Sequence, residues 1–338
     1  MAVYGEWQFD LFEGRIMAIL WCGGEDIDFA DFTGCSMSTT LGFRSSYARA
    51  GITLGDAAAA VSNQFSGGAV TSCWVRFYQL GNGFATNKFV GLGAFGTPYK
   101  GLWVGTGTSD SKVAIWKYVT SWTKLAEESG NHYVNTGLLI DVQLISYGAT
   151  GTINVYANGV LAVTYTGDLS VSGVSGFDCV MLGAVSTNSN PIVSEIIVSD
   201  TDTRNFPGLK TLAPTSDGTT TDWTGAYTEV DEATISDADV NYTDTADKDQ
   251  AFNVSNMPTG SFVIGAVKIA CRATKSEDAS IGKIALGYYS GSTAVGDDQS
   301  LTTAWATYES LDLTNPVTGA AFQQSEMNDL QINVRSRA

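Results

Sequence analysis

Apolar and polar residues alternate with a period of two along most of this 338-residue chain, a pattern typical of β-strands with one buried face. The clearest example is a pair of alternating runs at 151–157 and 160–167, joined by Asn158-Gly159. Asn-Gly favours a type I′ hairpin turn, because both central residues of that turn need positive φ. Similar runs recur at 73–78, 138–145, 177–184 and 193–200. The alternation therefore predicts an all-β protein built from antiparallel strands.

The same pattern and the composition divide the chain into three parts. Strand-like runs continue to about residue 213 and predict one antiparallel β-sandwich over 1–213, with a single short helix near 54–64. Residues 214–250 are rich in Thr and Asp, and we interpret them as an acidic connector. Alternation resumes after it, so 251–338 is predicted to form a second, smaller β-sandwich domain.

The charge and hydropathy of the chain exclude two classes of partner. The chain has 18 Lys and Arg against 35 Asp and Glu, for a formal net charge of −17. Phosphate binding needs clustered cations, so we expect no nucleic-acid partner. The apolar run at 16–22 falls far short of the roughly 20 residues that span a bilayer. We interpret it as a buried strand and expect no membrane partner.

Cysteine, histidine and glutamate usage argues against catalysis. The cysteines contain no C-x-x-C pair and predict reduced thiols, although a Cys22–Cys35 bridge stays an alternative. The single histidine, His132, lies in a polar loop without a nucleophile motif and is interpreted as structural. Glu195 stands alone on its strand, whereas glycoside hydrolysis needs paired carboxylates. We therefore expect no catalytic residues. The five cysteines are Cys22, Cys35, Cys73, Cys179 and Cys271.

Two sets of side chains are candidates for ligand binding. Carboxylate oxygens suit Ca²⁺, although Asx residues at strand ends more often cap their own turns. The candidate metal ligands are Asp26, Asp28, Asp31, Asp200 and Asp202. Aromatic rings that face solvent can stack on sugars, but on a sandwich strand the same face is as often the core. The candidate glycan-binding residues are Trp103, Trp116, Tyr118 and Trp122.

Several segments, taken in order, resemble structural proteins of tailed bacteriophages. The first two are 19–32 and the hairpin 153–169. The third, 194–225, contains the phrase S-E-hydrophobic-hydrophobic-V-x-D-x-D-T-R, then L-K-T-L-x-P and G-x-x-T-x-W-T-G. In that family these phrases follow a concanavalin-A-like, or laminin-G-like, sandwich. Segments 261–275 and 308–334 resemble the small β-domain that comes next in the same proteins.

This resemblance implies an N-terminal concanavalin-like jelly-roll sandwich and a non-enzymatic structural role in a phage virion. The expected position is the tail, a fibre or baseplate, or the capsid decoration, with assembly in the host cytoplasm. The expected partners are other virion proteins and further copies of the chain, a trimer being one such assembly. A glycan-binding module that contacts the bacterial host surface is the alternative function. The sugar and metal loops of concanavalin-like lectins do not match residue by residue, so their ligand residues are not transferred.

Overall fold

The computed structural model is an all-β protein, which confirms the fold class expected from the alternation. The residues that it describes are 19–31, 35–38, 51–54, 60–80, 86–97, 99–109, 112–132, 137–183, 191–205, 208–232, 234–277, 280–289 and 293–338. They fall into two compact units, an N-terminal unit ending at Asn205 and a C-terminal unit that is described from residue 208 onward. The helical segments among them are η1 (Asp26–Asp28), η2 (Thr203–Asn205), η3 (Tyr227–Glu229) and α1 (Gln324–Met327).

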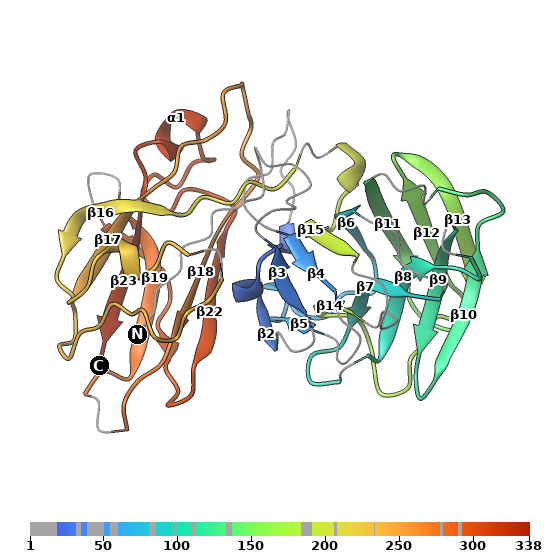
Figure 1. Cartoon of the computed structure of the whole chain (residues 1–338), viewed down its shortest axis with the longest axis horizontal. Coiled ribbons are helices and arrows are strands. Elements are labelled where there is room, and N and C mark those ends of the chain that lie inside the picture. Colours follow the sequence, from blue (N-terminus) through green and yellow to red (C-terminus); the bar gives the residue numbers. More distant parts are fainter. Residues whose placement is uncertain are drawn as a thin grey trace. The chain divides into compact units, whose positions relative to one another are not determined.

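The N-terminal unit is a sandwich of two antiparallel sheets (Figure 1). The first sheet has the order β13-β12-β11-β6-β15-β4-β3, and β1 also pairs with β15. Its strands are β1 (Ile19–Gly23), β3 (Ser36–Ser38), β4 (Gly51–Thr53), β6 (Cys73–Leu80), β11 (Leu138–Ser146), β12 (Gly151–Ala157), β13 (Val160–Gly167) and β15 (Ile192–Ser199).

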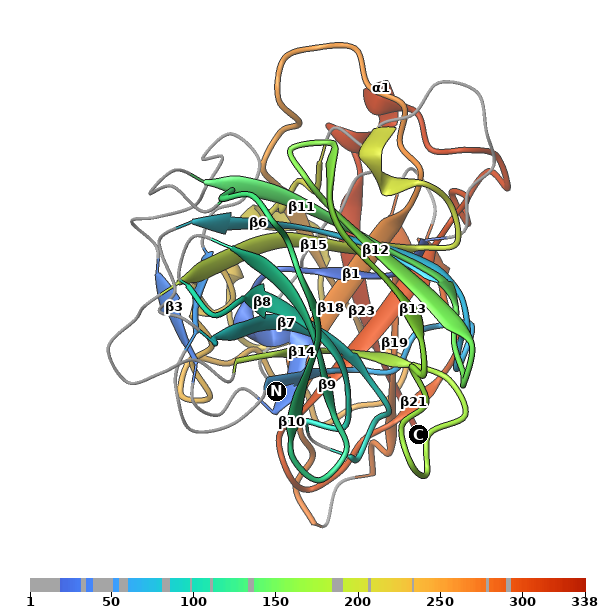
Figure 2. The same cartoon turned by 90° about the vertical axis from the view of Figure 1, so that its right-hand side faces the viewer.

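The second sheet of this unit has the order β10-β9-β8-β7-β14-β5-β2. Its strands are β2 (Phe29–Asp31), β5 (Ala60–Ser62), β7 (Lys88–Gly93), β8 (Gly101–Thr106), β9 (Val113–Tyr118), β10 (Trp122–Glu127) and β14 (Cys179–Leu182). In Figure 2, β6, β11, β12 and β15 form one layer, and β7, β8 and β14 form the other. Inward side chains such as Phe77, Ile140, Phe89 and Ile115 are fully buried between the layers. Burial contributes roughly 1.5–3 kcal/mol for each such side chain.

Of two local predictions in this unit, the hairpin turn is confirmed and the short helix is wrong. Asn158 and Gly159 have φ values of 49° and 79°, so β12 and β13 meet in the expected turn with two positive φ angles. The helix expected near 54–64 is contradicted where the chain is described, because β5 pairs with both β2 and β14. Strand pairing there outweighs the helix propensity of alanine. Residues 55–59 lie outside the described part.

The C-terminal unit is a smaller β-sandwich. One sheet has the order β16-β17-β23-β19-β20, with β21 also pairing with β19, and β18 pairs with β22 in a second sheet. Tyr288 of β19 reaches across, and its hydroxyl donates to Asp312 Oδ2 of β22 at 2.7 Å. The strands are β16 (Pro214–Thr221), β17 (Asp249–Val254), β18 (Val267–Ala273), β19 (Lys283–Tyr289), β20 (Thr293–Val295), β21 (Gln299–Ser300), β22 (Ala306–Asp312) and β23 (Gln331–Arg337).

The stretch 214–250 belongs to this second unit, which differs from the connector interpretation. Its first eight residues form β16 and pair with β17. Trp223 and Val230 are buried, and Trp223 Nε1 donates to the carbonyl of Lys248 at 3.1 Å. The Thr- and Asp-rich composition therefore marks an exposed edge strand and its loops. The division between the units falls near residue 206, ahead of the expected boundary at 213.

All five cysteines are free thiols, so the alternative Cys22–Cys35 bridge is not formed. Burial raises the pKa of Cys73 and of Cys179 to about 12. These two thiols therefore behave as small apolar side chains. Within the described residues, the helices are too short and too polar to cross a membrane.

Candidate functional site

The four aromatic candidates come together on the outer face of the second sheet, the face turned away from the core between the layers. Trp103 of β8 is the cross-strand partner of Trp116 on β9, and Tyr118 is the partner of Trp122 on β10. Trp103 is only 1% exposed and Trp116 only 7%. Their indole N–H groups donate to the carbonyls of Tyr99 and Thr106 at 2.8 and 3.0 Å. These two rings are therefore packing residues whose faces are closed to a sugar.

Glycines make room for this buried layer. Gly91 lies opposite Trp103 on the neighbouring strand β7. A Cβ at Gly91 would lie 2.5 Å from a ring atom of Trp103, so only glycine lets the indole lie flat over β7. Tyr118 and Trp122 are half-buried, with ring centroids 4.9 Å apart. Of the four candidates, these two keep partly accessible rings.

Lys88 lies in the same aromatic cluster, which the sequence did not indicate. Its Nζ is 4.3 Å from the Trp116 ring centroid and 4.6 Å from the Trp122 ring centroid. Nζ also donates to the carbonyl of Thr86. Burial lowers the pKa of Lys88 to about 8. Because its side chain is only 8% exposed, this cation is part of the packing.

The acidic residues of η1 serve their own turn. Asp28 Oδ2 accepts from the backbone N–H of Gly24 at 2.7 Å and of Glu25 at 2.9 Å. Asp26 Oδ1 accepts from the backbone N–H of Ile27 at 3.0 Å, and both aspartates are buried. Asp31 is the last residue of β2, and its side chain lies outside the described part. The hydrogen bonds of Asp26 and Asp28 fit the turn-capping alternative.

The second acidic pair follows β15. Asp202 Oδ1 accepts from the backbone N–H of Arg204 at 2.9 Å, and the two side chains form an ion pair. Asp200 is exposed on the preceding turn. Over the described ranges, no group of three or more His, Cys, Asp and Glu side chains is placed to hold a metal ion.

Residues 202–204, at the end of the N-terminal unit, pack against its first sheet. The Arg204 guanidinium lies 5.0 Å from the Trp74 ring centroid and 4.4 Å from that of Tyr156. These two rings are themselves stacked with centroids 5.8 Å apart. The S-D-T-D-T-R phrase therefore forms a latch, here called the exit latch and made of Asp202, Thr203 and Arg204.

Thr203 connects the exit latch to a buried ion pair. Its hydroxyl donates to Asp141 Oδ1 at 2.7 Å. Asp141 also accepts from Arg76 Nε at 2.8 Å and from Nη2 at 3.1 Å. The Asp141 side chain is fully buried and that of Arg76 is 3% exposed. These polar groups therefore satisfy one another inside the unit.

Glu195 and His132 lie in different parts of the N-terminal unit. Glu195 is 1% exposed and sits at an irregularity in the β15–β6 pairing with φ of 52°. His132 Nδ1 pairs with Glu128 Oε2, and Glu128 Oε1 accepts from the backbone N–H of Val113 at 2.6 Å. Glu195 lies within β15 and Glu128 directly after β10, and each is almost fully buried.

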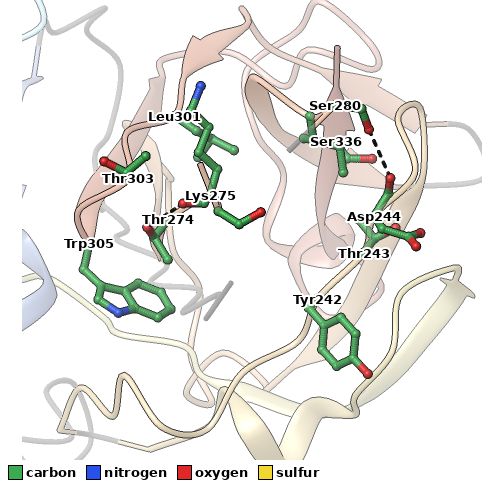
Figure 3. A pocket seen from close by; sticks show the side chains of 12 residues that line it. Tyr242, Thr243, Asp244, Thr274, Lys275, Ser280, Leu301, Thr303, Trp305 and Ser336 are labelled. Carbon is green, nitrogen blue, oxygen red and sulfur yellow. Dashed lines mark hydrogen bonds between the residues drawn. The ribbon is translucent and has the colours of Figure 1, made fainter. Parts of the chain in front are cut away.

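A cavity of about 690 Å³ lies in the C-terminal unit and includes none of the sequence candidates (Figure 3). Trp305 and Tyr242 stand on opposite sides of it, and the Tyr242 ring is 54% exposed. Ile281 and Leu301 add apolar surface. The volume falls within the roughly 300–1,000 Å³ typical of small-ligand sites. The hydroxyl side chains that line it are Thr243, Thr274, Ser276, Ser280, Thr303 and Ser336.

Fixed elements position the two aromatic walls. Trp305 directly precedes β22, and the Arg272 guanidinium lies 5.8 Å from its ring centroid. Arg272 is itself held by two hydrogen bonds to Asp237, at 2.7 and 3.0 Å. Tyr242 forms an isolated β-bridge with Thr224, with N–H to carbonyl distances of 2.9 and 2.8 Å. Both rings are therefore presented from an ordered backbone.

Sequence reasoning missed this cavity because five separate segments converge on it. The only local signals are Tyr242 and Trp305, single aromatic residues inside polar, Thr-rich stretches at 241–245 and 302–307. An aromatic side chain in such a stretch has few apolar neighbours along the chain. It therefore indicates either a long-range packing partner or an exposed ring.

No protein-family model matches the chain, and no curated protein matches it either. Similar solved structures include an endo-β-1,4-glucuronan lyase from Trichoderma reesei, at 9% identity over 56% of this chain and 99% of that chain, with a TM-score of 0.39. Another is the carbohydrate-binding module CBM66 from Bacillus subtilis, at 10% identity over 49% and 96%, with a TM-score of 0.35. A third is a carbohydrate esterase from the Shiga toxin-encoding bacteriophage phi24B, at 9% identity over 55% and 100%, with a TM-score of 0.36.

Proposed function

We propose that this protein is a non-catalytic glycan-binding module whose ligand site is the cavity of the C-terminal unit. The observation that carries the proposal is the placement of Trp305 and Tyr242 on two sides of a cavity otherwise rich in hydroxyl groups. The C–H face of a sugar ring is apolar and packs on an aromatic face, while its hydroxyls exchange hydrogen bonds with polar side chains. The cavity offers both kinds of contact.

The test is a glycan microarray with the full chain, followed by titration calorimetry with a glycan that is retained. Trp305→Ala should weaken binding by at least about tenfold, because buried aromatic anchors carry 2 kcal/mol or more in binding sites. Phe95→Ala is the matched control, since Phe95 is an exposed aromatic residue of the N-terminal unit. Equal affinity of the Trp305 variant and the parent chain would refute this site.

A virion component that assembles through protein–protein contacts is the second candidate, and the glycan site would then serve attachment to the host surface. The ordered resemblance of 19–32, 153–169 and 194–225 to tailed-phage structural proteins supports it. Light scattering on the full chain, with and without EDTA, tests the expected association. A stable symmetric oligomer favours this candidate, and dissociation by EDTA would favour bound calcium at its contacts. A monomer at high protein concentration counts against self-assembly.

A further inference from the structure

A basic residue lines the cavity of this acidic chain. Lys275 lines the cavity and is half-buried. Over the described residues, its Nζ has no carboxylate within 4.0 Å, even though acids outnumber bases by 35 to 18. Five other basic side chains of the unit are in ion pairs with acids. They are Lys268, Arg272, Lys283, Arg335 and Arg337.

The backbone around Lys275 is held in place. Its N–H donates to the carbonyl of Thr302 at 3.0 Å, and the Thr274 hydroxyl donates to the same carbonyl at 3.3 Å. The N–H of Thr302 in turn donates to the Tyr308 hydroxyl at 3.1 Å. The backbone of Lys275, just after β18, is therefore fixed to the loop between β21 and β22, and only the flexible side chain remains to be ordered by a ligand.

An acidic residue, Asp244, lines the cavity as well, and its Oδ1 accepts a hydrogen bond from the Thr245 hydroxyl at 2.9 Å. Asp244 lies across from Lys275 in Figure 3, beside Ser280 and Thr243. The Ser280 hydroxyl donates to the Asp244 carbonyl at 3.3 Å, which holds this segment. A carboxylate there accepts hydrogen bonds from sugar hydroxyls and repels a second anionic group. The cavity thus suits a ligand with an acidic group at one end and hydroxyl groups at the other.

We propose that the cavity binds an acidic saccharide, with the carboxylate of a uronic acid-type residue paired to Lys275. The hydroxyls of the same ligand face Asp244, and a sugar ring packs on Trp305. This inference rests on the proposed glycan-binding function and adds the ligand class. A charge-assisted hydrogen bond to a placed ammonium is worth roughly 1.5–3 kcal/mol, or about tenfold or more in affinity.

The experiment compares an oligogalacturonate with its carboxyl-reduced, neutral counterpart by calorimetry on the full chain. It is run at about 0.15 M salt, where the Debye length is about 8 Å and the net charge of the chain is screened beyond the cavity. We expect the acidic ligand to bind at least about tenfold more tightly. Lys275→Gln should remove that preference and Lys275→Arg should keep most of it. Lys283→Gln is the matched control, because Lys283 pairs with Asp298 and does not line the cavity.

The outcomes separate the two proposals. Equal binding of both oligosaccharides that is unchanged by Lys275→Gln but lost in Trp305→Ala overturns the ligand class and leaves the glycan site standing. If the microarray retains neutral glycans alone, the acidic ligand class is likewise overturned and the glycan site still stands. Absence of binding to either oligosaccharide, together with a blank microarray, overturns both proposals. Circular dichroism of each variant checks that a loss of binding is not a loss of fold.

Discussion

The buried Asp141 carboxylate should be one of the most sensitive positions of the N-terminal unit. It is fully buried and accepts three hydrogen bonds, two from Arg76 and one from Thr203. Asp141→Asn keeps the shape and removes the charge that neutralises the guanidinium. Breaking a buried ion pair from one side costs about 3–5 kcal/mol. In a unit of this size 1 kcal/mol shifts Tm by about 2–4 °C, so we expect a fall of about 6–20 °C.

Calorimetry of the full chain measures this shift, with Asp247→Asn as the control. Asp247 pairs with Arg337 but its side chain is 69% exposed, so its ion pair should contribute less than about 1 kcal/mol. The double variant Arg76→Met, Asp141→Leu removes both charges and should recover most of the lost stability. A fall in Tm of less than about 2 °C for Asp141→Asn, or a double variant no better than the single one, would refute the reasoning.

Two further predictions concern the outer face of the second sheet. Burial holds the pKa of Lys88 at about 8, below its ordinary 10.5. Between these two values the unfolded chain binds a proton that the folded chain has lost, so the free energy of unfolding should rise with pH, by up to about 3 kcal/mol. Lys88→Met should flatten that rise in urea unfolding at pH 7.5–10, and a flat curve for the parent chain would contradict it. Gly91→Ala should cost about 1–3 kcal/mol, because the new methyl group meets the Trp103 ring at 2.5 Å. In the same urea assay Gly67→Ala should be nearly neutral, since its Cβ would meet only Leu20 Cδ2 at 3.8 Å. Equal losses of stability in the two variants would contradict a steric clash at Gly91.

Those features of the fold that depend on neighbours in sequence could be predicted. The Asn158-Gly159 turn and the alternating runs on either side of it form β12 and β13. The helix expected near 54–64 was wrong at β5, where the strand exists because two other strands pair with it. Likewise, the polar composition of 214–250 did not indicate that β16 would pair with β17. Strand pairing uses backbone N–H and C=O groups, which are the same in polar and apolar residues.

The candidate site shows the same limit more sharply. Alternation placed Trp116 and Tyr118 on one face of a strand, but it did not distinguish the accessible ring from the buried one. Trp116 is 7% exposed because Trp103 lies beside it and Lys88 lies over its ring, and these come from two other strands. Tyr242 and Trp305, which line the cavity, are 63 residues apart in the sequence (305 − 242). A periodic pattern in the sequence does not indicate that two such distant residues line the same cavity.

The exit latch also determines how the N-terminal unit would bear a mechanical load. The chain leaves this unit directly after β15, which pairs with β6 on one side and with β4 and β1 on the other. A pulling force at residue 205 reaches β15 at Ser199, which pairs with Ile19 of β1, so it loads that end of the β1–β15 ladder before the rest. Arg204, whose guanidinium lies over the stacked rings of Trp74 and Tyr156, meets that force first. Because forced unfolding is governed by the unfolding rate, the contacts of the exit latch should help to set the force at which this unit opens.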